Sequence, residues 1–232
     1  HRNYADPEEV MESIGSDALR WHLMSSPIIR GGDLRVSEDG KEFADVVRLI
    51  LNPIWNTYSF FTTYANIDSH RATFRTDAGG DLDRYLLAKT AQLQSVMTER
   101  MDAYDIPGAC NNVASYLDSL TNWYVRRSRD RFWAPADRGT SGELGPDKAD
   151  AYDTLYTALT TLCRLVAPLL PLVAEEVYCG LTGEASVHLT DWPADDALPR
   201  DARLGIAMDR VRAVASATLS LREDHRLRTR LP

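Results

Sequence analysis

Apolar residues recur at helical spacing along most of this chain, and the clearest such stripe runs directly into a group of arginines. The stripe occupies one face of a single predicted helix, at Val113, Leu117, Leu120 and Tyr124. On a helix with about 3.6 residues per turn, a strict continuation of that face falls on Arg127 and Arg131. The sequence therefore predicts a helix over 107–133 whose inward side becomes positively charged in its last two turns.

The same periodicity, together with capping residues and prolines, predicts further helices. We expect them over 7–13, 17–25, 38–67, 82–104, 148–166, 172–180 and 201–221. Pro53 removes a backbone donor inside the third of these and predicts a kink there. The short connection at 106–108 makes the helices on either side of it antiparallel neighbours.

These helices indicate a mainly all-α fold, with an antiparallel helical bundle over 41–182. A small α+β connective segment is expected over 1–40, because residues 34–36 have the pattern of a short strand after a glycine turn. We expect an extended strap over 183–200. Residues 201–232 should form a helix and the start of a further C-terminal region.

Composition limits the classes of function. The chain has 232 residues, 44% of them hydrophobic, which is enough to bury a sizeable core. A formal net charge of -8 argues against a protein that coats nucleic acid with its whole surface, but it leaves room for a local basic patch. No apolar run approaches the length of a membrane span, and no signal peptide opens the sequence. We therefore expect a cytoplasmic protein with no membrane partner.

Motifs for catalysis, cofactors and metals are missing from the sequence. Cys110, Cys163 and Cys179 lie far apart with no C-x-x-C pair, which favours reduced, buried thiols over a zinc site. The dinucleotide-binding, P-loop and G-x-S-x-G patterns are also absent. We expect no catalytic residue, no metal ligand and no bound cofactor in this chain.

The arginine-rich helix end is the candidate binding site. Its residues are Asn122, Arg126, Arg127, Arg129, Arg131, Phe132 and Trp133. Planar guanidinium groups bind phosphates and aromatic rings stack on unstacked bases, so the cluster suits exposed nucleotides of an RNA loop. A polar side chain such as Asn122 could also contact base edges.

A structural interpretation of the two inward arginines fits the sequence equally well. Arg127 and Arg131 could lie with their stems on the core and their charged ends paired to carboxylates of a neighbouring helix. Glu175 or Glu176 could supply such a carboxylate. Adjacent residues diverge by about 100° on a helix, so a catalytic pair of these glutamates is disfavoured.

Several phrases of the sequence also carry a family resemblance. They are NWYVRRSRDRFW at 122–133, LNPIWNTYSFFTTYANID at 51–68, APLLPLVAEEVY at 167–178 and SVHLTDWP at 186–193. Together they resemble the anticodon-binding domain of isoleucyl-tRNA synthetases, class I enzymes that attach isoleucine to its tRNA. Residues 3–40 are similar to the segment that follows the ATP-handling KMSKS loop of that family.

The resemblance implies a division of labour. The chain would bind tRNA(Ile) and its anticodon, while a catalytic domain outside it would use ATP with magnesium, so that this part alone is inactive. It also implies that His1 marks a domain boundary, that the C-terminal region is cut short, and that the enzyme's catalytic and C-terminal domains are further partners. The equivalent domain of a valyl- or leucyl-tRNA synthetase is an alternative, and so is a helical protein-interaction module that binds an acidic partner.

Overall fold

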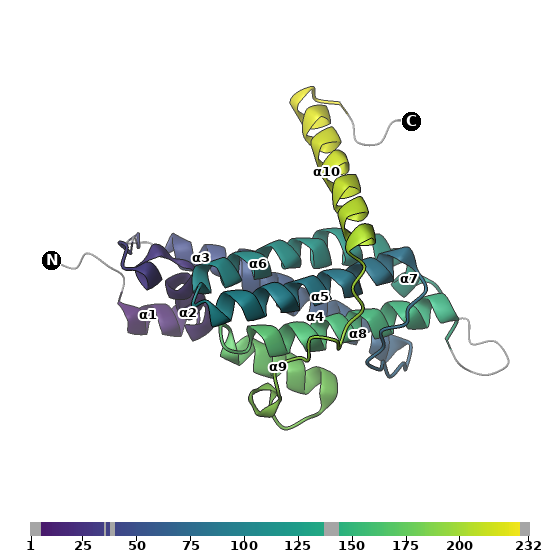
Figure 1. Cartoon of the computed structure of the whole chain (residues 1–232), viewed down its shortest axis with the longest axis horizontal. Coiled ribbons are helices and arrows are strands. Elements are labelled where there is room, and N and C mark those ends of the chain that lie inside the picture. Colours follow the sequence, from purple (N-terminus) through teal and green to yellow (C-terminus); the bar gives the residue numbers. More distant parts are fainter. Residues whose placement is uncertain (1–5, 35, 38–39, 137–143, 228–232) are drawn as a thin grey trace.

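The computed structural model describes residues 6–34, 36–37, 40–136 and 144–227, which form helices and irregular segments (Figure 1). The N-terminal elements are α1 (Pro7–Ser13), α2 (Ser16–Ser25) and the 3₁₀ turn η1 (Pro27–Arg30). The bundle consists of α3 (Lys41–Val46), η2 (Val47–Leu51), α4 (Asn52–Ile67), α5 (Asp81–Asp102), α6 (Ile106–Asp118), η3 (Ser119–Val125), α7 (Arg126–Trp133), α8 (Pro146–Val166) and α9 (Pro171–Thr182). The last elements are η4 (Val187–Leu189) and α10 (Ala202–Asp224). Within the described ranges, no helix combines the length and the apolar character of a bilayer-spanning segment.

Local sequence explains where several of these helices begin. The carboxylate of Asp6 accepts a hydrogen bond from the backbone N–H of Glu8 (3.0 Å) at the start of α1. Asp105 caps α6 in the same way through the N–H of Gly108 (3.1 Å). Both helices carry a proline in their first turn, where the missing N–H has no helical partner to lose. Such short-range signals place these starts close to where the sequence predicts them.

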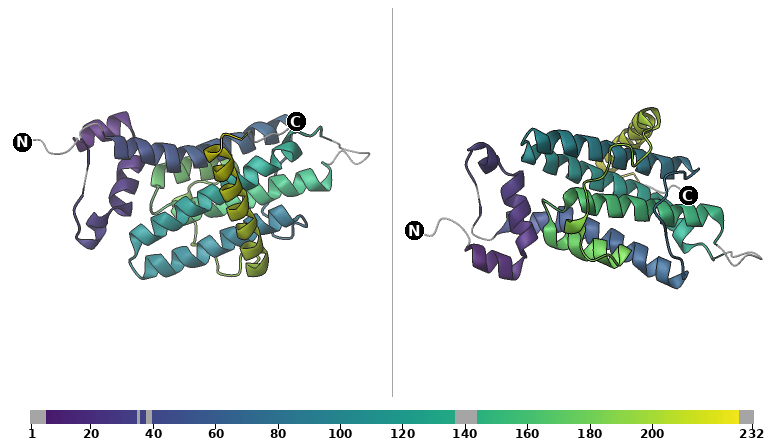
Figure 2. Two further views of the ribbon diagram at one scale, coloured as in Figure 1. Left: turned by 90° about the horizontal axis from the view of Figure 1, so that it is seen from above. Right: turned by 60° about the horizontal axis from the view of Figure 1, so that its bottom comes forward.

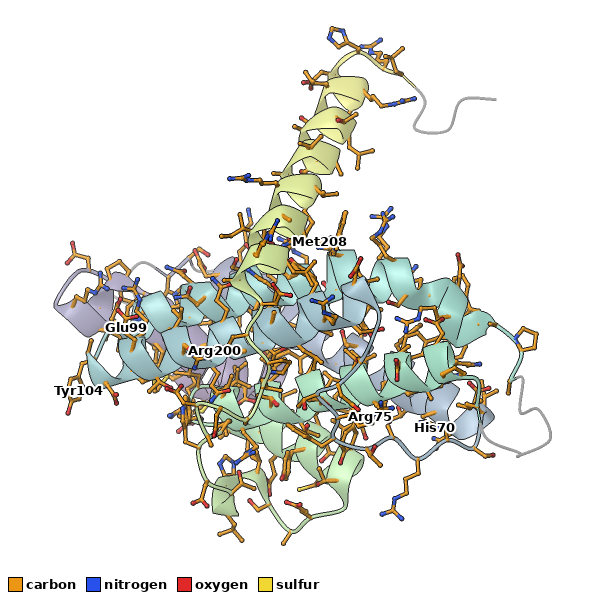
Figure 3. All side chains as sticks on the ribbon, turned by 45° about the vertical axis from the view of Figure 1, so that its right-hand side comes forward. His70, Arg75, Glu99, Tyr104, Arg200 and Met208 are labelled. Carbon is orange, nitrogen blue, oxygen red and sulfur yellow. The ribbon has the colours of Figure 1, made fainter. Side chains whose placement is uncertain are left out.

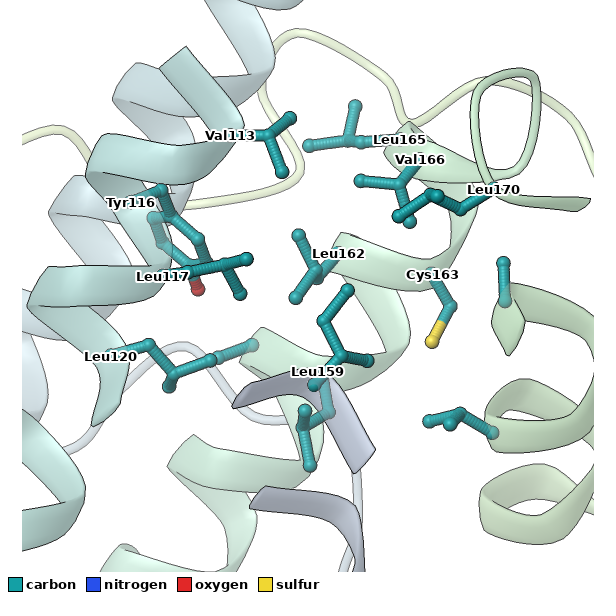
Figure 4. Close-up of a cluster of buried hydrophobic side chains, with 14 of the residues drawn as sticks. Val113, Tyr116, Leu117, Leu120, Leu159, Leu162, Cys163, Leu165, Val166 and Leu170 are labelled. Carbon is teal, nitrogen blue, oxygen red and sulfur yellow. The ribbon is translucent and has the colours of Figure 1, made fainter. Parts of the chain in front are cut away.

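The core lies between the long helices of the bundle. Leu117 of α6 and Leu120 of η3 face Leu159 and Leu162 of α8 (Figure 4), and all four side chains are at most 1% exposed. Residues 103–105 alone join α5 to α6, so these two helices run antiparallel, as expected. Truncation of one such leucine to alanine costs about 2–5 kcal/mol. Apolar packing therefore fixes the frame that carries the charged helix end.

The N-terminal segment packs on this frame. Trp21 of α2 is 4% exposed and belongs to the same apolar cluster as the bundle core. The carboxylate of Asp17 accepts a hydrogen bond from the backbone N–H of Val173 (2.8 Å), which satisfies a free donor at the start of α9. Helix α2 and the bundle therefore share one core.

Two π-helical turns interrupt otherwise continuous helices. The turn η2 joins α3 to α4 and ends directly before Asn52 and Pro53. Because the ring of Pro53 removes a donor and crowds the preceding turn, a wider turn relieves the helix at this point. The helix predicted over 38–67 is thus divided by a π turn just before Pro53, the position where the sequence predicts a kink. The second π turn, η3, joins α6 to α7 directly ahead of the arginine cluster.

The β part of the predicted connective segment is not found. Leu34 and Val36 have no regular structure, and residue 35 lies outside the described ranges, as does the expected helix start at residue 38. The stretch before them is a 3₁₀ turn from Pro27, ended by Gly31 with a φ of 77°. A single extended segment needs a second strand to pair with, and the described part of the chain offers none.

Helix α10 leaves the bundle instead of joining it. It crosses the bundle near its own N-terminal end and projects away from it along the rest of its length (Figures 1 and 2). Met208 lies near the end that meets the bundle (Figure 3). None of the residues of α10 is buried. The segment before α10 runs over α5, where Nε2 of Gln94 donates to the carbonyl oxygen of Pro193 (3.0 Å).

Candidate nucleic-acid interface

The π turn η3 changes which residues of the helix end face the core. A π turn contains about one more residue than a turn of α-helix. After it, the residues that point toward the core are therefore about one position later in the sequence than a constant helical period predicts. The residues after Tyr124 whose side chains are buried are Val125, Ser128 and Phe132, which are 6%, 0% and 1% exposed. A constant helical period instead places Arg127 and Arg131 on this face. The stripe prediction was wrong for Arg127, which is exposed, whereas Arg131 is only 17% exposed.

Arg131 is paired inside the bundle. Its Nη1 and Nη2 each donate to one carboxylate oxygen of Asp83 at 2.8 Å, and the side chain of Asp83 is 1% exposed. The Nε of Arg131 also donates to Asp147 at the start of α8 (3.1 Å). Burial alone would lower the pKa of Arg131, but the hydrogen bonds and charge of Asp83 outweigh it and raise that pKa. The paired interpretation is confirmed for Arg131, which connects α5, α7 and α8.

The carboxylate of Asp83 also accepts a hydrogen bond from a tyrosine. The phenol of Tyr124 donates to Oδ1 of Asp83 at 2.7 Å. Burial, and after it the charge of Asp83, raises the pKa of Tyr124 well above its ordinary value, so the phenol remains a donor. A buried carboxylate is stable only when its oxygens are satisfied in this way.

Phe132 lies in the core and not on the surface. Its ring packs edge-on against Phe60 and Tyr152, with ring centroids 5.0 Å and 4.9 Å apart. A ring that is 1% exposed offers no open face to a base. We therefore withdraw Phe132, together with the paired Arg131, from the candidate RNA-contacting residues.

Arg126, Arg129 and Trp133 share one outward face of α7, because they are spaced by three and four residues. Both arginines are exposed, and Trp133 is 54% exposed. The Nε1 of Trp133 donates to the hydroxyl of Tyr64 (2.8 Å), which orients the indole at the end of the bundle. This face offers open cations beside an open aromatic ring.

Arg127 is exposed and lies over the indole of Trp123. Its guanidinium carbon is 4.8 Å from the ring centroid, a cation–π contact that contributes about 0.5–1 kcal/mol at an exposed site. The Nε1 of Trp123 is shielded from solvent and has no hydrogen-bond partner among the described residues. Arg127 therefore does not follow the paired interpretation that holds for Arg131.

Asn122 continues this second surface. It is exposed, and its Nδ2 donates to Oδ1 of Asp118 (2.7 Å). Asn122, Trp123, Arg126 and Arg127 line one wall of an open groove of about 880 Å³, and residues of α10 line the other wall. Arg126 thus lies between the groove and the outward face of α7.

Neither of the two candidate glutamates pairs with an arginine of the cluster. The Oε2 of Glu175 accepts a hydrogen bond from the backbone N–H of Val187 (2.8 Å) and so holds the start of the strap. Glu176 is exposed. Burial, and after it the charge of Glu176, raises the pKa of Tyr58. The prediction that either one faces Arg127 or Arg131 was wrong, because α5 and α8, and not α9, place carboxylates beside Arg131.

Most residues that line the groove, Trp123 and Arg212 among them, are not among the predicted site residues. Trp123 precedes Arg127 by four residues, and this spacing of an aromatic ring and a cation on a helix could have indicated the pair. Arg212 of α10 reaches the groove from a distant part of the sequence, where no local pattern marks it. Residues 137–143, which separate the arginine cluster from α8, lie outside the described ranges.

Comparisons with known proteins show the family of this chain. A family model described as the anticodon-binding domain of tRNA ligase matches residues 83–232. The isoleucine–tRNA ligase of Mycobacterium tuberculosis (strain ATCC 25618 / H37Rv) is 54% identical over 231 residues, which are 100% of this chain and 21% of that protein. The isoleucine–tRNA ligase of Leifsonia xyli subsp. xyli is 52% identical over 100% of this chain and 20% of its own length.

A solved structure supports the fold. The agnB2 LeuRS of Agrobacterium radiobacter K84, in a ternary complex with tRNA and LeuAMS, superposes with a TM-score of 0.58 over 86% of this chain and 21% of that one, at 17% identity. The chain spans about a fifth of the length of the curated relatives it matches. Since the family model covers more than half of the sequence and includes the whole arginine cluster, this chain belongs to the family of anticodon-binding domains of tRNA ligases.

Proposed function

We propose that this chain is the part of an isoleucine–tRNA ligase that binds the anticodon loop of tRNA(Ile). The observation that carries the proposal is the open surface formed by Arg126, Arg127, Arg129 and Trp133 in a chain whose net charge is -8. The isoleucine–tRNA ligases that match the chain along its length, at 44–54% identity, support the choice of amino acid.

Three contributions to binding follow from the chemistry of this surface. The exposed arginines attract phosphates, and this attraction weakens as salt rises. The rings of Trp133 and Trp123 can stack on extruded bases, which contributes about 1–3 kcal/mol for each base. The amide of Asn122 can exchange hydrogen bonds with a base edge. The bundle core holds these groups in place before the RNA arrives.

Catalysis would take place elsewhere in the ligase. Isoleucine activation, with ATP and magnesium, and transfer to the tRNA would be carried out by the catalytic domain, and this chain alone would be inactive. Its role is to hold the tRNA so that the acceptor end reaches that site. Residues 1–40 would contact the tRNA stem beside the catalytic domain, and residues 201–232 would lead towards the C-terminal domain.

A binding experiment with altered anticodons tests the proposal. Fluorescence anisotropy measures the affinity of this chain for labelled tRNA(Ile) and for the same tRNA carrying a valine or leucine anticodon. We expect the exchange to weaken binding about tenfold or more, a difference of about 1.4 kcal/mol. Equal affinity for all three tRNAs would contradict anticodon recognition. No binding to any of them would favour a protein-interaction module.

A further inference from the structure

The groove beside α10 differs from the outward face of α7 in its shape and charge. Its volume of about 880 Å³ lies within the range of about 300–1,000 Å³ typical of small-molecule sites. One wall is a single face of the helix formed by α6, η3 and α7, and it carries the cation–π pair of Trp123 and Arg127. The other wall is α10, which presents the small side chain of Ser216.

Charge, and not apolar packing, holds the α10 wall in place. No residue of α10 is buried. Arg212 instead reaches across to the bundle, where its Nη2 donates to Asp118 (2.6 Å) and its Nη1 to the hydroxyl of Ser119 (2.7 Å). Asp209 accepts a hydrogen bond from the phenol of Tyr85 (2.7 Å). The position of this wall therefore depends on a few polar contacts around Arg212.

The charges along the groove favour one nucleotide over a run of phosphates. Four cationic and three anionic side chains line it: Lys89, Arg126, Arg127, Arg212, Asp118, Asp130 and Asp209. The carboxylates would repel a continuous phosphate backbone laid along the groove. A base carries no charge, and its flat face can stack on an aromatic ring or on a guanidinium plane, both of which this wall offers. Its phosphate can stay at the groove edge beside Arg126.

We propose that this groove takes up one unstacked base of the bound RNA loop, against Trp123 and Arg127 on one side and α10 on the other. Arg212 is the positioning residue for the α10 wall. The inference rests on the proposed function, because it requires that the chain binds the loop. It adds that one base is enclosed between α10 and η3, while the outward face with Trp133 binds the neighbouring part of the loop.

A substitution that fills the groove tests the site. The probe is an RNA hairpin with the anticodon stem and loop of tRNA(Ile), carrying fluorescent 2-aminopurine at one loop position at a time. Ser216→Leu fills the groove, and Ala217→Leu places the same side chain on the adjacent exposed residue, which does not line it. We expect Ser216→Leu to weaken binding about tenfold and to abolish the stacking signal of one loop position. Ala217→Leu should change neither quantity.

The role of Arg212 needs a second pair of variants. Arg212→Met removes its ion pairs, and Arg210→Met makes the same charge change on an exposed residue of the same helix. We expect Arg212→Met alone to speed hydrogen exchange along α10 in the RNA-free protein and to weaken hairpin binding. Arg212→Lys should recover part of both effects. Unchanged exchange in Arg212→Met would refute the positioning role.

The outcomes separate the two proposals. If the unaltered chain does not bind the hairpin, the proposed function fails and the groove assignment fails with it. If it binds and Ser216→Leu retains both affinity and stacking signal, only the groove assignment is overturned. If a polyglutamate peptide displaces the hairpin from the unaltered chain but itself fails to bind Ser216→Leu, the groove takes an acidic protein segment instead of a base.

Discussion

Arg131 and Asp83 form a buried ion pair through two hydrogen bonds of 2.8 Å, only two residues along the helix from the exposed Arg129. One short helix therefore contains arginines with different roles. Arg131 holds α7 to α5 and α8, while Arg129 and Arg126 extend from the same helix into solvent. The orientation of the open cations depends on the pair beneath them.

Arg131→Met should destabilise the fold, whereas Arg129→Met should not. The first change leaves the carboxylate of Asp83 buried without its cation, which costs about 3–5 kcal/mol. The second change removes an exposed charge, so the free energy of unfolding of this variant should stay within about 0.5 kcal/mol of that of the unaltered chain. Urea unfolding followed by circular dichroism measures both. Equal stability of the two variants would show that the buried pair does not hold α7.

Substitutions of the neighbouring residues Phe132 and Trp133 should also differ in their effects on stability and on RNA binding. Phe132→Ala opens a cavity between Phe60 and Tyr152 and should cost about 3–5 kcal/mol of folding free energy. Trp133→Ala should leave the melting temperature nearly unchanged but lower the affinity for tRNA, because the exposed indole is a stacking surface. Calorimetry and anisotropy, applied to both variants, test this. A Trp133→Ala protein with undiminished RNA affinity would exclude that residue from the interface.

Alkaline pH should destabilise the chain through its buried tyrosines. Burial, and after it a hydrogen bond to a carboxylate, raises the pKa of both Tyr85 and Tyr178 from 10.0 to about 12. The folded state therefore keeps these protons after the unfolded state has lost them. The stabilising contribution is complete below pH 10 and is lost as pH rises from 10 to about 12.

Two measurements check this pH dependence. The urea midpoint should stay level up to about pH 10 and fall above it. Absorbance at the phenolate band should rise later in the native chain than in urea. Coincident titration curves for native and denatured protein would contradict a raised pKa of the buried phenols.

The sequence predicts the helices of this fold well, because their signals are local. Asp6 with Pro7 and Asp105 with Pro107 start helices through contacts within one turn. The apolar stripe of Val113, Leu117, Leu120 and Tyr124 correctly predicts a core-facing side, because all four side chains are buried. These features need no knowledge of the rest of the chain.

The candidate site is predicted less completely, because tertiary packing decides the rest. The π turn η3 shifts the inward positions to Ser128 and Phe132, and a count at constant period cannot include that shift. The partner of Arg131 is Asp83, which precedes it by 48 residues, so sequence spacing could not select it over Glu175. The α10 wall depends on Arg212, whose contacts with Asp118 span 94 residues.

The salt dependence of RNA binding tests the central claim most directly. The quantity is the slope of log affinity against log salt concentration for the anticodon hairpin, measured with the unaltered chain and with Arg126→Ala/Arg127→Ala/Arg129→Ala. Each phosphate contact on single-stranded RNA contributes about 0.7 to the magnitude of that slope. If each arginine binds one phosphate, the slope of the triple variant should therefore be smaller in magnitude by about 2. Its melting temperature should change little, because all three side chains are exposed. Equal slopes for the two proteins would contradict the assignment of this helix end to RNA.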